Sequence, residues 1–365
     1  MKMRLLNLLA LFVLLSGMAA SGCTGVLSAG DSEKVPLVVF AAGSLITPFG
    51  ELEKAFENSH PGIDVQAEYH GSVQVMRHAT ELHEPIDVVA TADASLIPML
   101  MYTMTNPDTG SPYATWYIRF ASNHLALAYQ PGSLYADEIN DENWYDILVR
   151  PGVRVGIADP RFDATGYRAL MVYALAQEYY GVHTIFTNMF DGAFTYPLGI
   201  FTEGDQSIVT VPEILETVRG SHILVRGASI ELIALLESGD LDYAFEYESV
   251  IKQHDLQLLD LPAELDLGEA GYDPVYERVT VSLEFRRFAS VEPEFVGERI
   301  GYGITIPGSA PHPSEAAQFI SFLLGPEGHS IMQENDHPLF DPALGYEYDK
   351  IPASLQELCE PQESP

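Results

Sequence analysis

Two Gly-Ser pairs follow strand-like stretches near the start of the chain. Gly43-Ser44 comes after the apolar run 35–42, and Gly71-Ser72 comes after the alternating run 63–70. Glycine lets the backbone approach a ligand closely, and a serine hydroxyl with nearby backbone N–H groups can hold an anion. Either serine could equally be a helix N-cap. The pairs therefore predict neutral donors for a compact oxyanion or, alternatively, two helix starts.

Strand and helix patterns alternate around these pairs and must position them. Predicted strands cover 35–42, 63–70, 87–93, 124–129, 153–160, 241–250, 278–285 and 299–306, and predicted helices cover 46–61, 94–104, 169–181, 230–240 and 314–328. This order is typical of an α/β fold with parallel sheets covered on both faces. Ligands of such sheets lie at the carboxyl ends of strands, so the polar turns 161–167 and 245–249 are further candidates. The late strands could return to the first sheet through a double, hinge-like connection.

The composition limits the class of partner. The chain has 365 residues, with 18 Lys and Arg against 52 Asp and Glu, and a formal net charge of -34. No basic stripe can meet phosphates, so we expect no nucleic acid and no polybasic membrane anchor. A hydrophobic content of 47% and a charged content of 19% are typical of a globular protein. The length leaves room for about two domains.

The N-terminus has the pattern of a secretion signal. Lys2 and Arg4 precede the apolar run 5–18, which is shorter than the roughly 20 residues that span a bilayer. Small residues then lead to Cys23, as in the lipobox of exported lipoproteins. We expect a signal peptide at 1–22, a lipid-anchored tether at 23–35, and a location outside the cytoplasm at the cell membrane. A plain signal peptide is the alternative.

Motifs of common enzymes are missing from the sequence. It contains no G-x-S-x-G, H-E-x-x-H or G-x-x-x-x-G-K-[ST] pattern, and no G-x-G-x-x-G after a strand. The spacing of His70, His78 and His83 fits no common metal site. We therefore expect no enzyme and no cofactor, although 52 acidic residues leave a hydrolytic carboxylate pair open.

Several motifs in one order carry a family resemblance. The stretches "AAGSLITPFGELEKAFE", "DVVATADASLI", "RPGVRVGIADPRFDATGYRALMVYALAQEYY", "ALLESGDLDYAFEYESV" and "GYGITIPGSAPHPSEAAQFISFLLGPEG" resemble the archaeal tungstate/molybdate-binding protein, the extracellular receptor of an ABC importer. The similarity runs from about Leu37 to about Leu344. It implies the two-lobed type II periplasmic-binding-protein fold, with lobe I at 36–125 plus 265–357, lobe II at 126–264 and the ligand cleft between them. A monomer is expected, with a permease and its ATPase as partners.

The resemblance also implies which residues bind the oxyanion. Ser44 and Ser72 match two serines that donate from the first lobe. Thr165 and Ser229 fall where backbone N–H groups of the second lobe donate, and Tyr247 matches a tyrosine whose hydroxyl donates. Both lobes would therefore contact the same anion, and binding would favour the closed form.

Carboxylates are the unusual part of the implied site. In this family an aspartate, matched by Asp163, and a glutamate from a later turn are thought to coordinate the metal of the oxyanion and expand it to six-coordination. Carboxylates would repel sulfate, whose sulfur does not readily accept further donors. The position of the family's glutamate holds Ser229, and Glu231 two residues on is the weaker candidate. Asp163 could instead cap the helix that follows it.

The predicted function is therefore capture of tungstate or molybdate for import. One alternative is a receptor of the same fold for sulfate, phosphate or a small organic acid. An extracellular hydrolase and a structural adhesin are alternatives from other classes.

Overall fold

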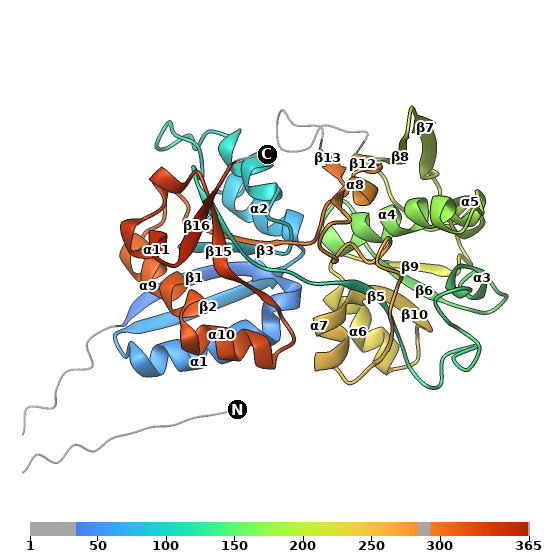
Figure 1. The fold of residues 1–365 in the computed structure, drawn as a ribbon, viewed down its shortest axis with the longest axis horizontal. Coiled ribbons are helices and arrows are strands. Elements are labelled where there is room, and N and C mark those ends of the chain that lie inside the picture. The colour runs from blue at the N-terminus through green and yellow to red at the C-terminus, as the bar shows by residue number, and fades with distance from the viewer. Residues whose placement is uncertain (1–33, 284–292, 364–365) are drawn as a thin grey trace, which may run out of the picture. The chain divides into compact units, whose positions relative to one another are not determined.

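In the computed structural model, the strands of the described residues form three sheets (Figure 1). The structure describes residues 34–283 and 293–363, and the chain from Lys34 on forms one compact unit. Sheet I has the strand order β16-β15-β4-β14-β3-β1-β2, sheet II has β11-β5-β10-β6-β9, and sheet III has β13-β12-β8-β7. The predicted signal peptide 1–22, Cys23 and nearly all of the tether 23–35 lie outside the described residues.

The bounds of the elements are as follows. The strands are β1 Val35–Ala42, β2 Ile63–His70, β3 Val88–Thr91, β4 Tyr117–Ala121, β5 Leu125–Tyr129, β6 Val155–Ala158, β7 Gly199–Glu203, β8 Gln206–Val211, β9 Ile223–Arg226, β10 Tyr243–Tyr247, β11 Gln257–Leu259, β12 Val279–Leu283, β13 Glu294–Val296, β14 Tyr302–Thr305, β15 Leu339–Tyr346 and β16 Cys359–Gln362. The helices are η1 Gly43–Leu45, α1 Ile46–Ser59, α2 Ser72–Thr80, η2 Ile97–Tyr102, α3 Trp144–Ile147, α4 Ala164–Tyr179, α5 Ile185–Phe190, α6 Ile230–Glu237, α7 Glu248–Gln253, α8 Asp273–Tyr276, α9 Pro313–Leu324, α10 Pro326–Glu334, η3 Tyr348–Lys350 and α11 Ala353–Gln356.

Sheet I begins with the predicted alternation of strands and helices. β1 lies between β2 and β3 and pairs parallel to both. In α1 the buried residues Phe49, Leu52 and Phe56 recur at the spacing of one helix face, and the helix ends at Ser59, just before His60-Pro61. The carboxyl ends of β1 and β2 therefore lie side by side, and each carries one of the two Gly-Ser pairs.

Sheet II has three parallel strands at its centre and edge. β10 pairs parallel to β6 and β6 pairs parallel to β9, whereas β5 pairs antiparallel to β10. The helix after β6 starts at Ala164, inside the stretch 161–167 that the sequence analysis treats as a turn. It starts early because the side chain of Asp163 accepts a hydrogen bond from the backbone N–H of Thr165 and caps the first turn.

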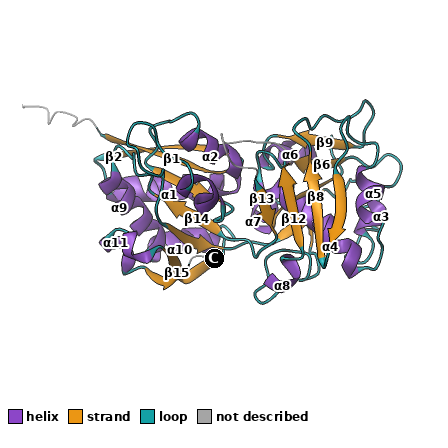
Figure 2. Cartoon of the chain, turned by 90° about the horizontal axis from the view of Figure 1, so that it is seen from above, coloured by secondary structure: helices purple, strands orange, loops and turns teal. Residues whose placement is uncertain are grey.

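Sheet III covers a second side of α4. Helix α4 contacts both β8 and β12 (Figure 2), and every residue from Ala164 to Ala176 is buried. The predicted strand 278–285 appears here as β12, parallel to β8, and so it does not return to sheet I. β14, from the predicted strand 299–306, does return, between β3 and β4. The predicted lobe limit between 264 and 265 divides sheet III, and the two-lobe boundaries stay a prediction.

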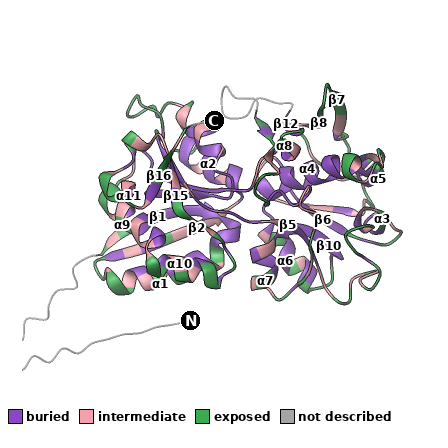
Figure 3. Ribbon diagram, viewed as in Figure 1, coloured by how far each residue is buried: buried purple, intermediate pink, exposed green. Residues whose placement is uncertain are grey.

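Two short connections join sheet I to sheets II and III. The chain leaves β4 for β5 through residues 122–124 and comes back from β13 to β14 through residues 297–301. Backbone bonds tie both to one loop, because Leu125 donates to the carbonyl of Asp266 and Ile300 donates to that of Leu267. Buried residues continue along the strands on both sides of these connections (Figure 3).

Candidate oxyanion site

The sequence-predicted residues lie where strands end. Ser44 follows β1, Ser72 follows β2, Asp163 follows β6, Ser229 follows β9 and Tyr247 closes β10. All five are buried, with at most 5% of each residue exposed, and Thr165 in the first turn of α4 is fully buried. Six of the predicted residues are thus buried at the strand ends of sheets I and II.

The serines of sheet I each receive a hydrogen bond from the protein framework. The backbone N–H of Ala92 donates to Oγ of Ser72 at 3.1 Å. The hydroxyl of Tyr302 donates to Oγ of Ser44 at 2.9 Å, and it accepts from Nδ2 of Asn123 at 3.2 Å. Neither serine is an N-cap, since Ser44 lies within η1 and Ser72 is the first residue of α2. Each serine proton is left to donate elsewhere.

On sheet II, Asp163 occupies two backbone donors. Its Oδ1 accepts from the N–H of Thr165 at 2.8 Å, and its Oδ2 accepts from the N–H of Ser229 at 3.2 Å. These are the N–H groups that the resemblance assigns to the anion. Burial raises the pKa of Asp163, whereas the same two hydrogen bonds lower it. The carboxyl of Asp163 therefore stands where oxygens of an anion would be held.

Tyr247 is linked to sheet I through a buried cation. Nη1 of Arg168 donates to the Tyr247 hydroxyl at 2.6 Å and to the carbonyl of Ala92 at 2.8 Å. The same Ala92 donates to Ser72. Burial raises the pKa of Tyr247 to about 12, so the phenol keeps its proton at neutral pH. Since its oxygen accepts from Arg168, that proton can donate to a ligand.

The turns of sheet I and sheet II are in direct contact. A Cβ on Gly71 would lie 2.4 Å from the carbonyl oxygen of Phe162, and the N–H of Gln74 donates to that oxygen at 3.2 Å. Nη2 of Arg168 lies 3.4 Å from Oδ2 of Asp93, which follows β3 in sheet I. The two groups of predicted residues thus lie against each other across a closed contact.

Glu231 and Cys23 are not part of this group. Glu231 is exposed in the first turn of α6, and its Oε1 lies 3.6 Å from where a Cβ on Gly227 would be. Cys23 lies outside the described residues. Glu231 thus stays the weakest member of the predicted set.

A buried glutamate that the sequence analysis missed lies beside Asp163. Glu246 is 1% exposed, and its Oε1 accepts from the N–H of Tyr247 at 2.8 Å. Burial, with a further contribution from the carboxylate of Asp163, raises its pKa to about 8. The signal was present in the sequence, because Glu246 is the single acid in the otherwise apolar strand 243–247.

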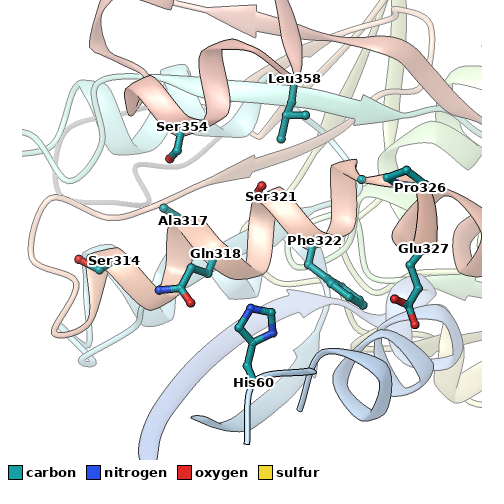
Figure 4. Close-up of a pocket in the computed structure, with 11 residues that line it drawn as sticks. His60, Ser314, Ala317, Gln318, Ser321, Phe322, Pro326, Glu327, Ser354 and Leu358 are labelled. Atoms are coloured by element: carbon teal, nitrogen blue, oxygen red, sulfur yellow. The ribbon is translucent and has the colours of Figure 1, made fainter. Parts of the chain in front are cut away.

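Within residues 34–283 and 293–363, no three His, Cys, Asp or Glu side chains lie close enough together to form a metal site. His70 and His78 stack on each other, with ring centroids 4.5 Å apart. A groove of about 560 Å³ lies between α9, α11 and His60, and it contains none of the predicted residues (Figure 4). No helix in the described ranges has the length and apolar character needed to cross a membrane.

Comparison with known proteins identifies the family. Residues 37–335 match the family described as bacterial extracellular solute-binding protein. The chain is 38% identical to an uncharacterized solute-binding protein of Methanoculleus marisnigri, over 98% of this chain and 99% of that protein. It is 36% identical to another from Petrotoga mobilis, over 88% of this chain and 89% of that protein.

Solved structures support the same fold. The periplasmic molybdate-binding protein of Azotobacter vinelandii matches with a TM-score of 0.52 and 15% identity, over 84% of this chain and 100% of that one. The sulfate-binding protein SubI of Mycobacterium tuberculosis matches with a TM-score of 0.52 and 15% identity, over 90% and 93%. At such identity these likenesses concern the fold alone, and they confirm the predicted two-lobed α/β class. The chain belongs to the family of bacterial extracellular solute-binding proteins, and it is a binding protein and not an enzyme.

Proposed function

We propose that this chain captures tungstate or molybdate outside the cytoplasm and delivers the oxyanion to the permease of an ABC importer. Membership of the solute-binding family supports the transport role. The choice of an oxyanion follows from the donors at the strand ends of sheets I and II. Compact anions can be bound by such neutral donors without a counter-charge.

One observation carries this proposal. The oxygens of Ser44, Ser72 and Tyr247 each accept a hydrogen bond from the protein framework, so their protons are oriented away from those donors. Donors arranged before the ligand arrives lose less conformational freedom on binding. The three hydroxyls come from both sides of the contact between the turns of sheets I and II, so an anion held by all three would favour the closed arrangement.

Calorimetric titration of a soluble form that begins at Thr24 tests the proposal. Tungstate, molybdate, sulfate and phosphate are added in separate experiments. Tight one-to-one binding of the first two, with no heat from the others, is the expected result. Tight binding of sulfate or phosphate alone would support the alternative receptor of the same fold. Silence for all four would contradict an oxyanion site.

We also propose that Cys23 carries the lipid that holds the receptor at the membrane. The basis is the small-residue sequence that precedes this cysteine. Expression of the full chain with Cys23→Ser should release the protein from the membrane fraction, and mass spectrometry of the wild-type N-terminus should show an acylated cysteine. Equal membrane retention of both forms would contradict the anchor. Light scattering of the soluble form should give a monomer.

A further inference from the structure

One carboxyl oxygen of Glu246 is buried without a hydrogen-bond partner. Its Oε1 accepts from the backbone of Tyr247, whereas its Oε2 is buried and has no hydrogen-bond partner. Native proteins satisfy nearly all buried polar atoms, and an exception needs a reason. A ligand that is bound only part of the time is such a reason.

The surroundings of Glu246 are the predicted oxyanion site. The carboxylate of Asp163 is near enough to raise its pKa, and the nearby hydroxyl of Ser229 lowers it, although it makes no hydrogen bond to Oε2. Tyr247 is its chain neighbour and backbone donor. Asp163 and Ser229 follow β6 and β9, which come after β10 in the order of sheet II and run parallel to it, so three of the six buried predicted residues lie at the same end of this sheet as Glu246.

The buried cation nearby does not neutralise Glu246. Arg168 is engaged with the hydroxyl of Tyr247, the carbonyl of Ala92 and the carboxylate of Asp93. A buried carboxyl without a cation is costly unless it is protonated or bound to another group. If the Glu246 carboxyl had no role at the anion site, the free energy needed to bury it there would weaken anion binding.

We propose that the Glu246 carboxyl gives its proton to solvent when the oxyanion binds and that its Oε2 then bonds to the central atom, so that the site holds two carboxylates, Asp163 and Glu246. This inference rests on the proposed function and names the second carboxyl at that site. It comes from the end of β10 and not from Glu231 on α6. Tungsten and molybdenum accept further oxygen donors, whereas the sulfur of sulfate and the phosphorus of phosphate do not. Two carboxyls would therefore favour the first two anions and repel the others.

Calorimetry of Glu246→Gln tests the role of this carboxyl. The substitution keeps the size of the side chain but leaves an amide, which cannot become a carboxylate. We expect the affinity for tungstate and molybdate to fall by about tenfold or more, without a fall for sulfate. The matched control is Glu237→Gln. The carboxylate of Glu237 is half exposed and lies at the C-terminal end of α6, away from Ser229. This variant should bind as the wild type does.

Two results would overturn the inference. One is a Glu246→Gln protein that binds tungstate within about threefold of the wild type. The other is tighter binding of all four anions, which would make Glu246 only a source of repulsion. If the wild-type protein binds neither tungstate nor molybdate, the proposed function is wrong. If the wild type binds them and Glu246→Gln binds them equally well, only the inference about Glu246 is wrong.

X-ray absorption at the molybdenum edge gives a readout that needs no variant. Free molybdate is tetrahedral and has a strong pre-edge feature. We expect this feature to weaken when molybdate binds to the wild-type protein, because the centre gains carboxyl oxygens. A bound spectrum that keeps the full tetrahedral feature would overturn the bond to Glu246.

Discussion

Ser72 and Tyr247 receive hydrogen bonds from groups whose donor role is fixed. A backbone N–H and a guanidinium can only donate, so the hydroxyls of Ser72 and Tyr247 must be the acceptors. Tyr302 accepts from Asn123 and donates its own proton to Ser44, so the oxygen of Ser44 is an acceptor as well. The direction of each proton at the site follows from chemistry one residue further away.

Separate variants of Ser44 and Tyr302 distinguish donation from orientation. Ser44→Ala removes the proposed donor, and we expect the affinity for tungstate to fall by about tenfold or more, as for a hydrogen bond to a charged group. Tyr302→Phe leaves the Ser44 hydroxyl in place and removes the bond that orients it, together with the bond from Asn123, so its loss of affinity should be smaller. Titration calorimetry gives both values. A larger loss for Tyr302→Phe than for Ser44→Ala would contradict this order.

His337 links acidity to stability. It is fully buried, with Nε2 3.3 Å from Oγ of Ser249, and burial lowers its pKa to about 4. In the unfolded chain His337 takes up a proton near pH 6.5, whereas in the folded chain it does so only near pH 4. The stability that neutral His337 contributes is therefore fully present above pH 6.5 and is lost as the pH falls toward 4. The loss should reach up to about 3 kcal/mol.

Urea unfolding across this pH range measures the effect. His337→Gln should show a weaker decline in the free energy of unfolding with acid than the wild type does. His183→Gln, at an exposed position, should keep the wild-type decline. Parallel curves for His337→Gln and wild type would argue against a titrating His337.

At the scale of elements, the contact between the turns of sheets I and II depends on a missing side chain. Gly71 has φ -59, a conformation open to any residue, but a Cβ there would lie 2.4 Å from the carbonyl oxygen of Phe162. We expect Gly71→Ala to hold the turns apart and to weaken anion binding by about tenfold or more, while the melting temperature stays near that of the wild type. Gly62→Ala, with no atom within 4 Å of the added Cβ, is the control. Unchanged affinity for Gly71→Ala would mean that this contact is not needed.

The elements also indicate what the sequence could and could not predict. Parallel strands bring their carboxyl ends to one edge, so Ser44 and Ser72 could be placed from the strand pattern, whereas Ser229 follows β9, a strand that was not predicted, and could be placed from the resemblance alone. Glu246 stands out as the single acid of an apolar strand, but the strand pattern does not say whether this acid is buried, because its burial depends on elements that pack against β10, such as α4 and α6. Similarly, β12 joins β8 through a parallel pairing over more than sixty residues of chain, and local periodicity contains no trace of it.

The whole molecule carries a charge that opposes its proposed ligand. With a formal net charge of -34, the long-range field should slow the approach of a dianion, so affinity must come from local hydrogen bonds. Salt screens this field beyond about 10 Å at 0.1 M. We expect the association rate constant for tungstate in stopped-flow fluorescence to rise with ionic strength. A rate that falls with added salt would point to steering by a local positive field.

The burial of α4 from Ala164 to Ala176 has a consequence for hydrogen exchange. Its residues from Ala164 to Ala176 are enclosed between sheets II and III, and its first turn carries Thr165. Such amides exchange with deuterium only when the whole unit unfolds, whereas the turns after β1 and β2 can exchange whenever the contact between sheets I and II opens. The wall of the site on α4 should therefore keep its amide protons for the lifetime of the fold. The amides of the turns after β1 and β2 should exchange much faster, at each opening that lets a ligand enter or leave.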